Sequence, residues 1–197
     1  MVACIVAISG KRKSGKDYCA RILRKELERR NVAVTVTGIS HRLKALFASR
    51  HGLDYEELLT DGPYKEKYRA EMIKWGEDAR SRDPGVFCRH AIEQHQASDV
   101  IIISDCRRKT DYSFFVEKFS TLTVRIEASD EDRRKRGFQF VEGVDDAESE
   151  CGLDDYGNFD VHLQNRTGDD IRAQIDAIAD KIEDTVKNFE KNKNKKL

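Results

Sequence analysis

The feature that most constrains this chain is a glycine-rich segment at residues 10–17, with the sequence Gly-Lys-Arg-Lys-Ser-Gly-Lys-Asp. An apolar run precedes it and a helical pattern follows it, as in a P-loop. Gly10 and Gly15 allow backbone N–H groups to turn inward around phosphate oxygens, while Lys16 and the N-terminus of the following helix face the β and γ phosphates. Asp17 stands where a P-loop usually has Ser or Thr. The pattern predicts that the chain binds a nucleoside triphosphate; a basic surface loop is the alternative interpretation.

Length and composition narrow the classes of protein further. A chain of 197 residues predicts one domain, residues 1–197, with a sizeable core. Charged residues make up 37% of the chain and cancel to a formal net charge of zero, so we expect neither nucleic acid nor a membrane as partner. The five cysteines are odd in number and scattered, without a Cys-x-x-Cys pair. This pattern favours reduced thiols inside the cell over a disulfide frame or a zinc site.

The two ends of the chain carry little targeting information. The apolar opening is too short to cross a bilayer and runs directly into the P-loop pattern, so we expect neither a signal peptide nor a transmembrane helix. The terminal Lys-Lys-Leu is only faintly similar to the peroxisomal Ser-Lys-Leu signal. We therefore expect a cytoplasmic protein, with the peroxisome as the alternative.

Apolar runs and helical patterns alternate along the chain. The runs at residues 4–9, 32–37, 100–104, 122–128 and 159–163 predict five strands, and three of them are nearly continuous, as in a parallel sheet covered on both faces. The first helical pattern places Tyr18, Ile22, Leu23 and Leu27 on one face. The last repeats at spacings of three and four through Ile171, Ile175, Ile178, Ile182, Val186 and Phe189. We predict a three-layer α/β fold with right-handed crossovers and a central parallel sheet of about five strands.

Two segments interrupt this alternation. The segment at about residues 40–95 contains several helical patterns and no convincing strand, which predicts a helical substrate-binding region. The segment at about residues 130–158 begins with a charged helical pattern and continues into a polar, turn-rich stretch. We interpret this second segment as a mobile lid.

The helical pattern at residues 64–80 carries a cationic wedge. Its apolar stripe consists of Tyr64, Tyr68, Met72, Trp75 and Ala79, which we expect in the core. At roughly 100° per residue, Lys65, Arg69 and Arg80 fall within a wedge of about 60° beside that stripe. Gly76 lies in the same wedge, where a missing side chain would let a ligand approach the backbone. Because the acids Glu66, Glu71 and Glu77 fall outside the wedge, we favour an anion-binding face over an ordinary solvated one.

Further charged residues lie where ligands are expected. The cations Lys11, Arg12, Lys13 and Lys16 are more than nucleotide binding requires, which suggests that a second anion meets the first. Asp105 directly follows a predicted strand, where a Walker-B carboxylate would help to hold Mg²⁺; a helix cap is the alternative. Arg107 and Arg108 follow at the carboxyl end of the same strand, where open α/β sheets bind ligands. Arg133 and Arg136, at the mouth of the lid, would stabilise a transferring phosphoryl group or belong to a surface charge run.

Several motifs of other nucleotide-binding classes are missing from the sequence. No Asn-Lys-x-Asp stands where a GTPase would recognise guanine, and no His-Arg-Asp or Asp-Phe-Gly marks a protein kinase. No general base stands out. A phosphate acceptor fits this pattern, because it is already ionised at neutral pH and needs no deprotonation.

Three stretches together carry a family resemblance. They are residues 9–17, the segment Met-Ile-Lys-Trp-Gly-Glu at residues 72–77 with Asp-Pro-Gly at 83–85, and Gly-Val-Asp-Asp-Ala-Glu-Ser-Glu-Cys-Gly-Leu-Asp at 143–154. On these motifs the chain resembles the animal-type phosphomevalonate kinases over nearly its whole length. The resemblance implies a nucleoside-monophosphate-kinase-like fold. It also implies transfer of the γ-phosphoryl group of MgATP to (R)-5-phosphomevalonate, which gives 5-diphosphomevalonate in the mevalonate route to isoprenoids and sterols.

The resemblance also implies roles for particular residues. The ATP-binding set is Gly10, Lys11, Arg12, Lys13, Ser14, Gly15, Lys16, Asp17, Arg133 and Arg136. The set expected to act in catalysis is Lys13, Lys16, Asp17, Arg107 and Arg136. The set expected on the acceptor side is Lys65, Arg69, Arg80, Arg107, Arg108, Asn165 and Arg172. Magnesium is expected at Asp17 and Asp105. Arg166 departs from the family's histidine, so that contact is not carried over.

Two other functions stay open at this point. A nucleoside-monophosphate kinase would hold a base in an aromatic or amide-lined pocket, whereas the cationic wedge suits a small, doubly anionic acid. A nucleotide-gated binding module would use ATP only as a switch, and would not need arginines that enclose a transferring phosphoryl group. We expect a monomeric enzyme.

Overall fold

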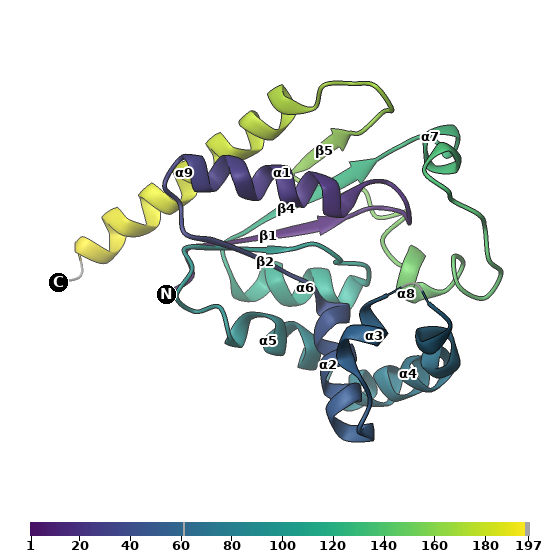
Figure 1. The fold of residues 1–197 in the computed structure, drawn as a ribbon. Coiled ribbons are helices and arrows are strands. Elements are labelled where there is room, and N and C mark those ends of the chain that lie inside the picture. Colours follow the sequence, from purple (N-terminus) through teal and green to yellow (C-terminus); the bar gives the residue numbers. More distant parts are fainter. Residues whose placement is uncertain (61, 196–197) are drawn as a thin grey trace.

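The computed structural model describes residues 1–60 and 62–195 and contains one five-stranded sheet (Figure 1). The strand order is β2-β3-β1-β4-β5, and every pairing is parallel. The strands are β1 (Cys4–Ser9), β2 (Val34–Thr37), β3 (Val100–Ile103), β4 (Thr121–Glu127) and β5 (Val161–Gln164). The predicted central parallel sheet is therefore confirmed, and each strand end differs from the expected one by at most two residues.

Helices cover both faces of this sheet. In Figure 1, α1 (Lys16–Arg29) and α9 (Arg172–Asn194) lie on one face, and α5 (Val86–Glu93) and α6 (Lys109–Lys118) lie on the other. Successive side chains of β1 alternate between the two cores: Val6 and Ile8 pack under α1 and α9, whereas Ile5 and Ala7 pack toward α5 and α6. Both faces of the strand are buried, which explains why its sequence is continuously apolar.

The amphipathic faces of the two long helices were predicted with different success. The expected stripe of α9 is correct, since Ile175, Ile178 and Ile182 are buried against the sheet. In α1, Leu23 and Leu27 are buried as expected, but Tyr18 is 47% exposed and was placed wrongly. Cys19 and Ala20 take its place in the core, because the first turn of α1 presents these small residues to the sheet.

The predicted helical region consists of four helices between β2 and β3. They are α2 (Ile39–His51), α3 (Tyr55–Leu59), α4 (Pro63–Arg82) and α5. Phe47, Leu58 and Met72 form a separate small core between α2, α3 and α4. Within the described part of residues 40–95 there is no strand, as the sequence predicted.

The lid segment, residues 130–158, connects β4 to β5. It contains the short helices α7 (Asp130–Lys135) and α8 (Glu148–Cys151), joined mostly by turns. In Figure 1 it passes beside the carboxyl end of the sheet, on the same side as α4. Across the part of the chain that the structure describes, no helix is both long and apolar enough to cross a membrane. The last two residues of the Lys-Lys-Leu tail lie outside the described residues.

The carboxyl ends of the five strands bring together the segments that the sequence singled out. The P-loop follows β1, the first turn of α2 follows β2, Asp105 with Arg107 follows β3, the lid follows β4, and Asn165 follows β5. In a parallel sheet these ends meet at one edge, where ligands bind in open α/β folds.

Candidate active site

The P-loop has a backbone that turns inward at glycine. Gly10 and Gly15 have φ angles of 156° and 93°. A Cβ at Gly10 would lie 2.5 Å from the carbonyl oxygen of Ile126 in β4, so no other residue fits there without a shift. The side chain of Ser14 is buried, and its hydroxyl has no hydrogen-bond partner among the described residues. The loop therefore holds an unsatisfied buried donor as well as a compact backbone curve.

Lys16 lies at the start of α1 beneath this loop. Its ammonium group donates to the carbonyl oxygen of Lys11 at 3.2 Å. Burial, and after it the positive charge of Arg107, lowers the pKa of Lys16 to about 8. Asp17 follows in the first turn, exposed, where a negative charge is favourable at a helix N-terminus. The negative charge of Asp17 favours the charged form of Lys16, although the two side chains form no ion pair among the described residues.

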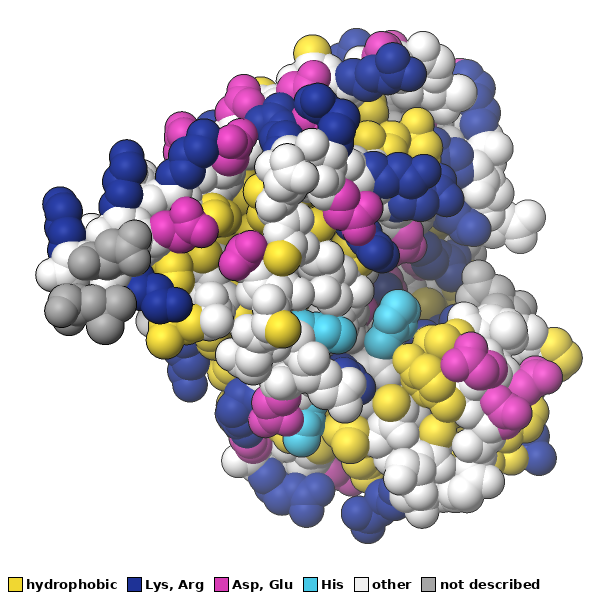
Figure 2. All heavy atoms as spheres, turned by 60° about the vertical axis from the view of Figure 1, so that its left-hand side comes forward, with side chains coloured by type: hydrophobic (Ala, Val, Ile, Leu, Met, Phe, Trp, Pro, Cys, Tyr) yellow, Lys and Arg dark blue, Asp and Glu magenta, His cyan; other side chains and the backbone are white. Residues whose placement is uncertain are grey.

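Two adjoining cavities lie at the carboxyl edge of the sheet. The P-loop cavity, about 640 Å³, is lined by the P-loop, the first turn of α2, Asp105, Arg107 and Arg136. The α4 cavity, about 200 Å³, lies between α2, α4, the residues after β3 and the lid. The two cavities share lining residues, among them Lys65, Arg69, Asp105, Arg107 and Glu150. Figure 2 shows Lys and Arg side chains gathered around a recess, with acidic side chains among them.

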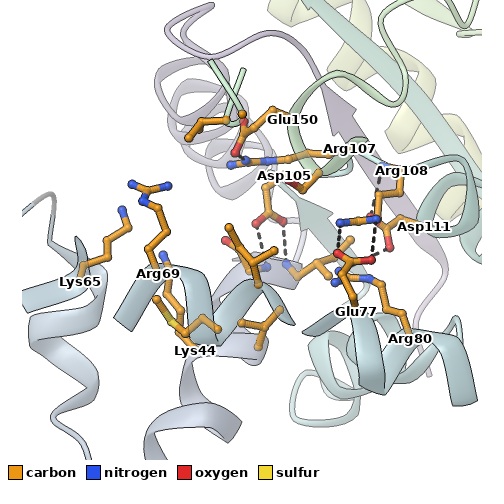
Figure 3. Close-up of a pocket in the computed structure, with 18 residues that line it drawn as sticks. Lys44, Lys65, Arg69, Glu77, Arg80, Asp105, Arg107, Arg108, Asp111 and Glu150 are labelled. Carbon is orange, nitrogen blue, oxygen red and sulfur yellow. Dashed lines mark hydrogen bonds and ion pairs between the residues drawn. The ribbon is translucent and has the colours of Figure 1, made fainter. Parts of the chain in front are cut away.

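The α4 cavity combines six basic side chains with an apolar wall (Figure 3). The basic residues are Lys44, Lys65, Arg69, Arg80, Arg107 and Arg108, and the apolar residues are Ile39, Leu43, Met72, Ile73 and Val144. In Figure 3, Lys65 and Arg69 lie on one side, Arg80 and Arg108 on the other, and Arg107 lies beside Glu150 at the lid. The cationic wedge predicted on α4 therefore does face a cavity.

Three expectations about α4 need correction. Gly76 packs against Leu43 of α2, whose methyl carbon would lie 2.6 Å from an added Cβ, so the glycine admits a neighbouring helix and not a ligand. Glu77 lies in the cavity and forms an ion pair with Arg108. Glu66, also expected outside the wedge, lies 2.5 Å from Arg69. The helical wheel placed these acids on other faces, but their side chains are long enough to reach the arginines.

Asp111 supports the far side of the same cavity. Its side chain is buried beside Cys88, lies 4.0 Å from Arg80, and accepts the backbone N–H of Arg108 at 3.3 Å. Burial raises the pKa of Asp111, partly offset by the charge of Arg80. The arginine itself stacks over the ring of Phe87. These contacts hold Arg80 and Arg108 in place from behind.

Asp105 acts as a cap for α2. Its carboxylate accepts the backbone N–H groups of Ile39 at 2.6 Å and Ser40 at 2.9 Å. Burial works to raise the pKa of Asp105, but the charge of Arg107 and these two N–H groups hold the pKa below its ordinary value. Each carboxylate oxygen thus accepts one backbone hydrogen bond from the first turn of α2.

The lid arginines contact the backbone of the P-loop. Arg133 donates to the carbonyl oxygen of Arg12 at 2.8 Å, and its guanidinium lies 3.8 Å from the ring centre of Phe138. Arg136 donates to the carbonyl oxygens of Ser14 at 2.9 Å and Asn165 at 2.7 Å. The expected proximity of both arginines to the P-loop is therefore present, and α7 is more than a surface charge run.

Two residues expected on the acceptor side lie elsewhere. The amide of Asn165 is buried and donates to the carbonyl oxygen of Ser14 at 2.8 Å, so Asn165 braces the P-loop and lines neither cavity. The side chain of Arg172 is 83% exposed and lies 3.8 Å from Asp170. It lines neither cavity in the described structure, because the first turn of α9 points it toward solvent.

Comparisons with known proteins identify the family. Residues 8–121 match the phosphomevalonate kinase family. A phosphomevalonate kinase of Drosophila melanogaster is 43% identical over 186 residues, which cover 91% of this chain and 96% of that protein. The chain belongs to the phosphomevalonate kinase family. The resemblance stated from the three sequence stretches is thereby confirmed.

Solved structures of low sequence identity align with this chain. The Mycobacterium tuberculosis APS kinase, solved with AMPPNP and APS, aligns with a TM-score of 0.53 at 15% identity, covering 91% of this chain and 96% of that one. Shikimate kinase from Aquifex aeolicus aligns with a TM-score of 0.44 at 15% identity over the same shares. At these identities the APS kinase likeness concerns the fold alone.

The structure of this kinase shows cavity-lining residues that the sequence analysis did not identify. Lys44 on α2 and Ser40 in its first turn line both cavities, and Glu150 joins them from the lid. One signal pointed to Ser40, since it follows shortly after the strand predicted at residues 32–37, at the edge where ligands bind. Nothing in the spacing of Glu150 indicates its position, which depends on how the lid folds back over Arg107.

Proposed function

We propose that this chain transfers the γ-phosphoryl group of ATP to (R)-5-phosphomevalonate, forming 5-diphosphomevalonate and ADP in the mevalonate route to isoprenoids. The observation that carries the proposal is that the two cavities adjoin and share lining residues. A P-loop cavity suited to a triphosphate adjoins an α4 cavity that is lined by six basic residues, four acidic residues and an apolar wall. A small acid with a carboxylate at one end and a phosphate at the other has the charge and aliphatic character that this lining complements.

The P-loop cavity fits the triphosphate of ATP. The buried hydroxyl of Ser14 and the buried Nε of Arg12 have no hydrogen-bond partner among the described residues, and phosphate oxygens would satisfy them. The backbone N–H groups around Gly15 and the positive end of α1 add to this cradle, with Lys16 on the β and γ oxygens. Arg136, which joins the lid to Ser14, would close the cradle from above.

The site also suits magnesium. Asp17 lines the P-loop cavity with an exposed carboxylate, the kind of oxygen ligand that Mg²⁺ takes. Asp105 lines the same cavity and offers a second carboxylate. Bound Mg²⁺ would neutralise charge on the β and γ oxygens. The helix-cap role of Asp105, which the structure displays, is compatible with this.

On the acceptor side, the basic residues lie in two groups on opposite sides of the α4 cavity (Figure 3). Lys65 and Arg69 from α4 face Arg80 and Arg108 across the α4 cavity, so anionic groups at both ends of the acceptor would find partners. Arg107 lines both cavities and therefore stands where the two substrates meet. A guanidinium there would stabilise charge on the phosphoryl group during transfer. The acceptor phosphate is itself the nucleophile, and it needs no base to remove a proton.

A nucleoside-monophosphate kinase is the alternative reaction. Its acceptor cavity would need aromatic or amide side chains to hold a base. Among the described residues that line the α4 cavity, none is aromatic, none carries an amide side chain, six are basic and four are acidic. This composition favours a small acid with two anionic groups over a nucleoside monophosphate.

One assay tests the proposal. The enzyme is given MgATP with phosphomevalonate, mevalonate, AMP or CMP in turn, and formation of ADP is followed by a coupled reaction. We expect turnover with phosphomevalonate and very little with mevalonate. Robust phosphorylation of mevalonate, or of AMP in preference to phosphomevalonate, would contradict it. We further infer one domain that acts as a monomer in the cytosol; gel filtration at micromolar concentration and fractionation of cells would check both points.

A further inference from the structure

The lid segment meets the phosphate-binding cations through carboxylates. Asp145 lies 3.0 Å from Arg12, and Glu148 lies 3.7 Å from Arg108. Glu150 forms an ion pair with Arg107. All three acids come from the stretch at residues 143–154 that marks the family. The acids therefore lie on the arginines that the two substrates would use.

Glu150 has the most telling position of the three. It lines the P-loop cavity, the α4 cavity and a third cavity of about 310 Å³ under the lid. Its side chain is 19% exposed, whereas that of Glu148 is 66% exposed. Partial burial strengthens an ion pair, because water screens it less. The ion pair of Glu150 with Arg107 is thus stronger than that of Glu148 with Arg108, and it lies where ATP and the acceptor would meet.

Arg107 keeps capacity for a further anion. Its Nε is buried and has no hydrogen-bond partner among the described residues, although its Nη1 donates to Glu150. The positive charge of Arg107 disfavours the charged form of Lys16, whereas the negative charge of Glu150 favours it. Asp17 and Asp105 favour the charge on Lys16 as well, and Glu150 links the two cations because it also forms an ion pair with Arg107.

We propose that Glu150, assisted by Glu148, is a specificity-determining residue that makes phosphoryl transfer depend on the anionic acceptor and suppresses transfer to water. The inference rests on the function proposed above. With ATP alone, the ion pair with Glu150 keeps Arg107 from stabilising charge on the transferring phosphoryl group. A dianionic acceptor displaces the carboxylate and releases Arg107 to the phosphoryl group.

The chemistry explains why water is disfavoured. Hydrolysis forms a bond from water oxygen to the γ-phosphorus, breaks the bond to the β,γ-bridging oxygen, and releases a proton to solvent. Transfer breaks the same bond but forms the new one from an acceptor phosphate oxygen, with no proton released. Water is neutral and cannot compete with Glu150 for Arg107, whereas a phosphate can.

Removal of the Glu150 charge tests this inference. Glu150→Gln should raise acceptor-free ATP hydrolysis about fivefold and lower the KM for phosphomevalonate by a similar factor, since the competing carboxylate is gone. Glu148→Gln should have a smaller effect in the same direction. Glu142→Gln is the matched control, because this exposed lid residue forms no ion pair within the described structure; it should leave both quantities unchanged.

The outcomes separate the inference from its alternatives. Equal effects in all three variants would show only a loss of lid charge and would overturn it, as would unchanged hydrolysis in a folded Glu150→Gln enzyme. A measurement on the unmodified enzyme is independent of folding: sulfate, a dianion, should raise acceptor-free hydrolysis severalfold, and chloride at equal ionic strength should not. No difference between the two salts would also overturn the inference. A wild-type enzyme that does not consume phosphomevalonate would instead remove the proposed function.

Discussion

The carboxylate of Asp105 accepts the backbone N–H of Ile39 at 2.6 Å, so a residue that follows β3 holds the first turn of a helix that follows β2. This helix, α2, carries Leu43 and Lys44 into the α4 cavity. The position of the proposed acceptor site thus depends on a hydrogen bond between residues that follow two neighbouring strands.

We expect Asp105→Asn to destabilise the protein by about 1–3 kcal/mol, because a buried charged acceptor for two N–H groups becomes a neutral one. The pKa of Asp105 is lowered in the folded chain, so its contribution is complete above the unfolded value of 3.8 and is lost as the pH falls through the folded pKa. Urea unfolding at pH 7 and at pH 3.5 checks this. The gap in unfolding free energy between wild type and variant should narrow in acid; a constant gap would contradict the cap.

The cations of α4 should act on the acceptor and not on ATP. Arg69→Met or Lys65→Met should raise the KM for phosphomevalonate tenfold or more and leave the affinity for ATP nearly intact, because each charge-assisted contact contributes about 1.5–3 kcal/mol. Steady-state kinetics with each substrate varied in turn measure both effects.

Arg172→Met serves as the control for these variants. It removes the same charge from an exposed side chain that lines neither cavity, and we expect no change in either KM. If Arg69→Met weakened both substrates equally, the α4 cavity would not be the acceptor site.

The sequence predicted the sheet well for a physical reason. Strands buried on both faces, such as β1 and β3, are continuous apolar runs that few other structures produce. The repeat along α9 is equally specific, since Ile175, Ile178 and Ile182 all face one surface. The buried strands and the buried face of α9 depend on burial alone, and the spacing of apolar residues along the sequence indicates which residues are buried.

Side-chain partners across elements could not be predicted in the same way. A helical wheel describes one helix, so it placed Gly76 beside the cations without revealing that Leu43 of α2 packs on it. It excluded Glu77 from the wedge, although the side chain reaches Arg108. Such contacts depend on the distance between elements, which spacing along the chain does not encode.

The pKa of Lys16 should appear in the pH dependence of ATP binding. Burial and the charge of Arg107 lower this pKa to about 8, so the ammonium group is charged below that pH and neutral above it. Phosphates bind the charged form. We therefore expect kcat/KM for ATP to fall above about pH 8, as this ratio reports the free enzyme. Lys16→Arg stays charged, so its profile, at lower absolute activity, should lack the fall. An identical fall in the arginine variant would assign the pKa to another group.

Arg136 should couple the lid to catalysis. It joins α7 to the carbonyl oxygens of Ser14 and Asn165. Arg136→Met should lower kcat by about a hundredfold, because a cation placed where charge develops stabilises the transition state. Lys135→Met is the control, since Lys135 is exposed, pairs with Glu131 and lines neither the P-loop cavity nor the α4 cavity.

Hydrogen exchange across residues 130–158 tests the lid directly. We expect protection to increase when ATP and phosphomevalonate bind together, because ordered segments exchange more slowly. The same protection with and without both substrates would mean that this segment does not close.

Asp17 is the residue that departs from the general P-loop pattern, and two roles for it can be separated. It lies in the first turn of α1, where a negative charge stabilises the helix by a few tenths of a kcal/mol to about 1 kcal/mol. It also lines the P-loop cavity, where a carboxylate would bind Mg²⁺ directly or through water. The absence of an ion pair with Lys16 in the described structure leaves this carboxylate facing the cavity.

The magnesium role predicts a kinetic change that helix stabilisation does not. Asp17→Asn should cut kcat about a hundredfold, roughly 2.7 kcal/mol of barrier, and raise the Mg²⁺ concentration needed for half-maximal rate. The stabilising role predicts a small fall in melting temperature with the magnesium dependence unchanged. A magnesium titration of the folded variant decides between them, and a curve that coincides with the wild-type one would assign Asp17 to the helix end alone.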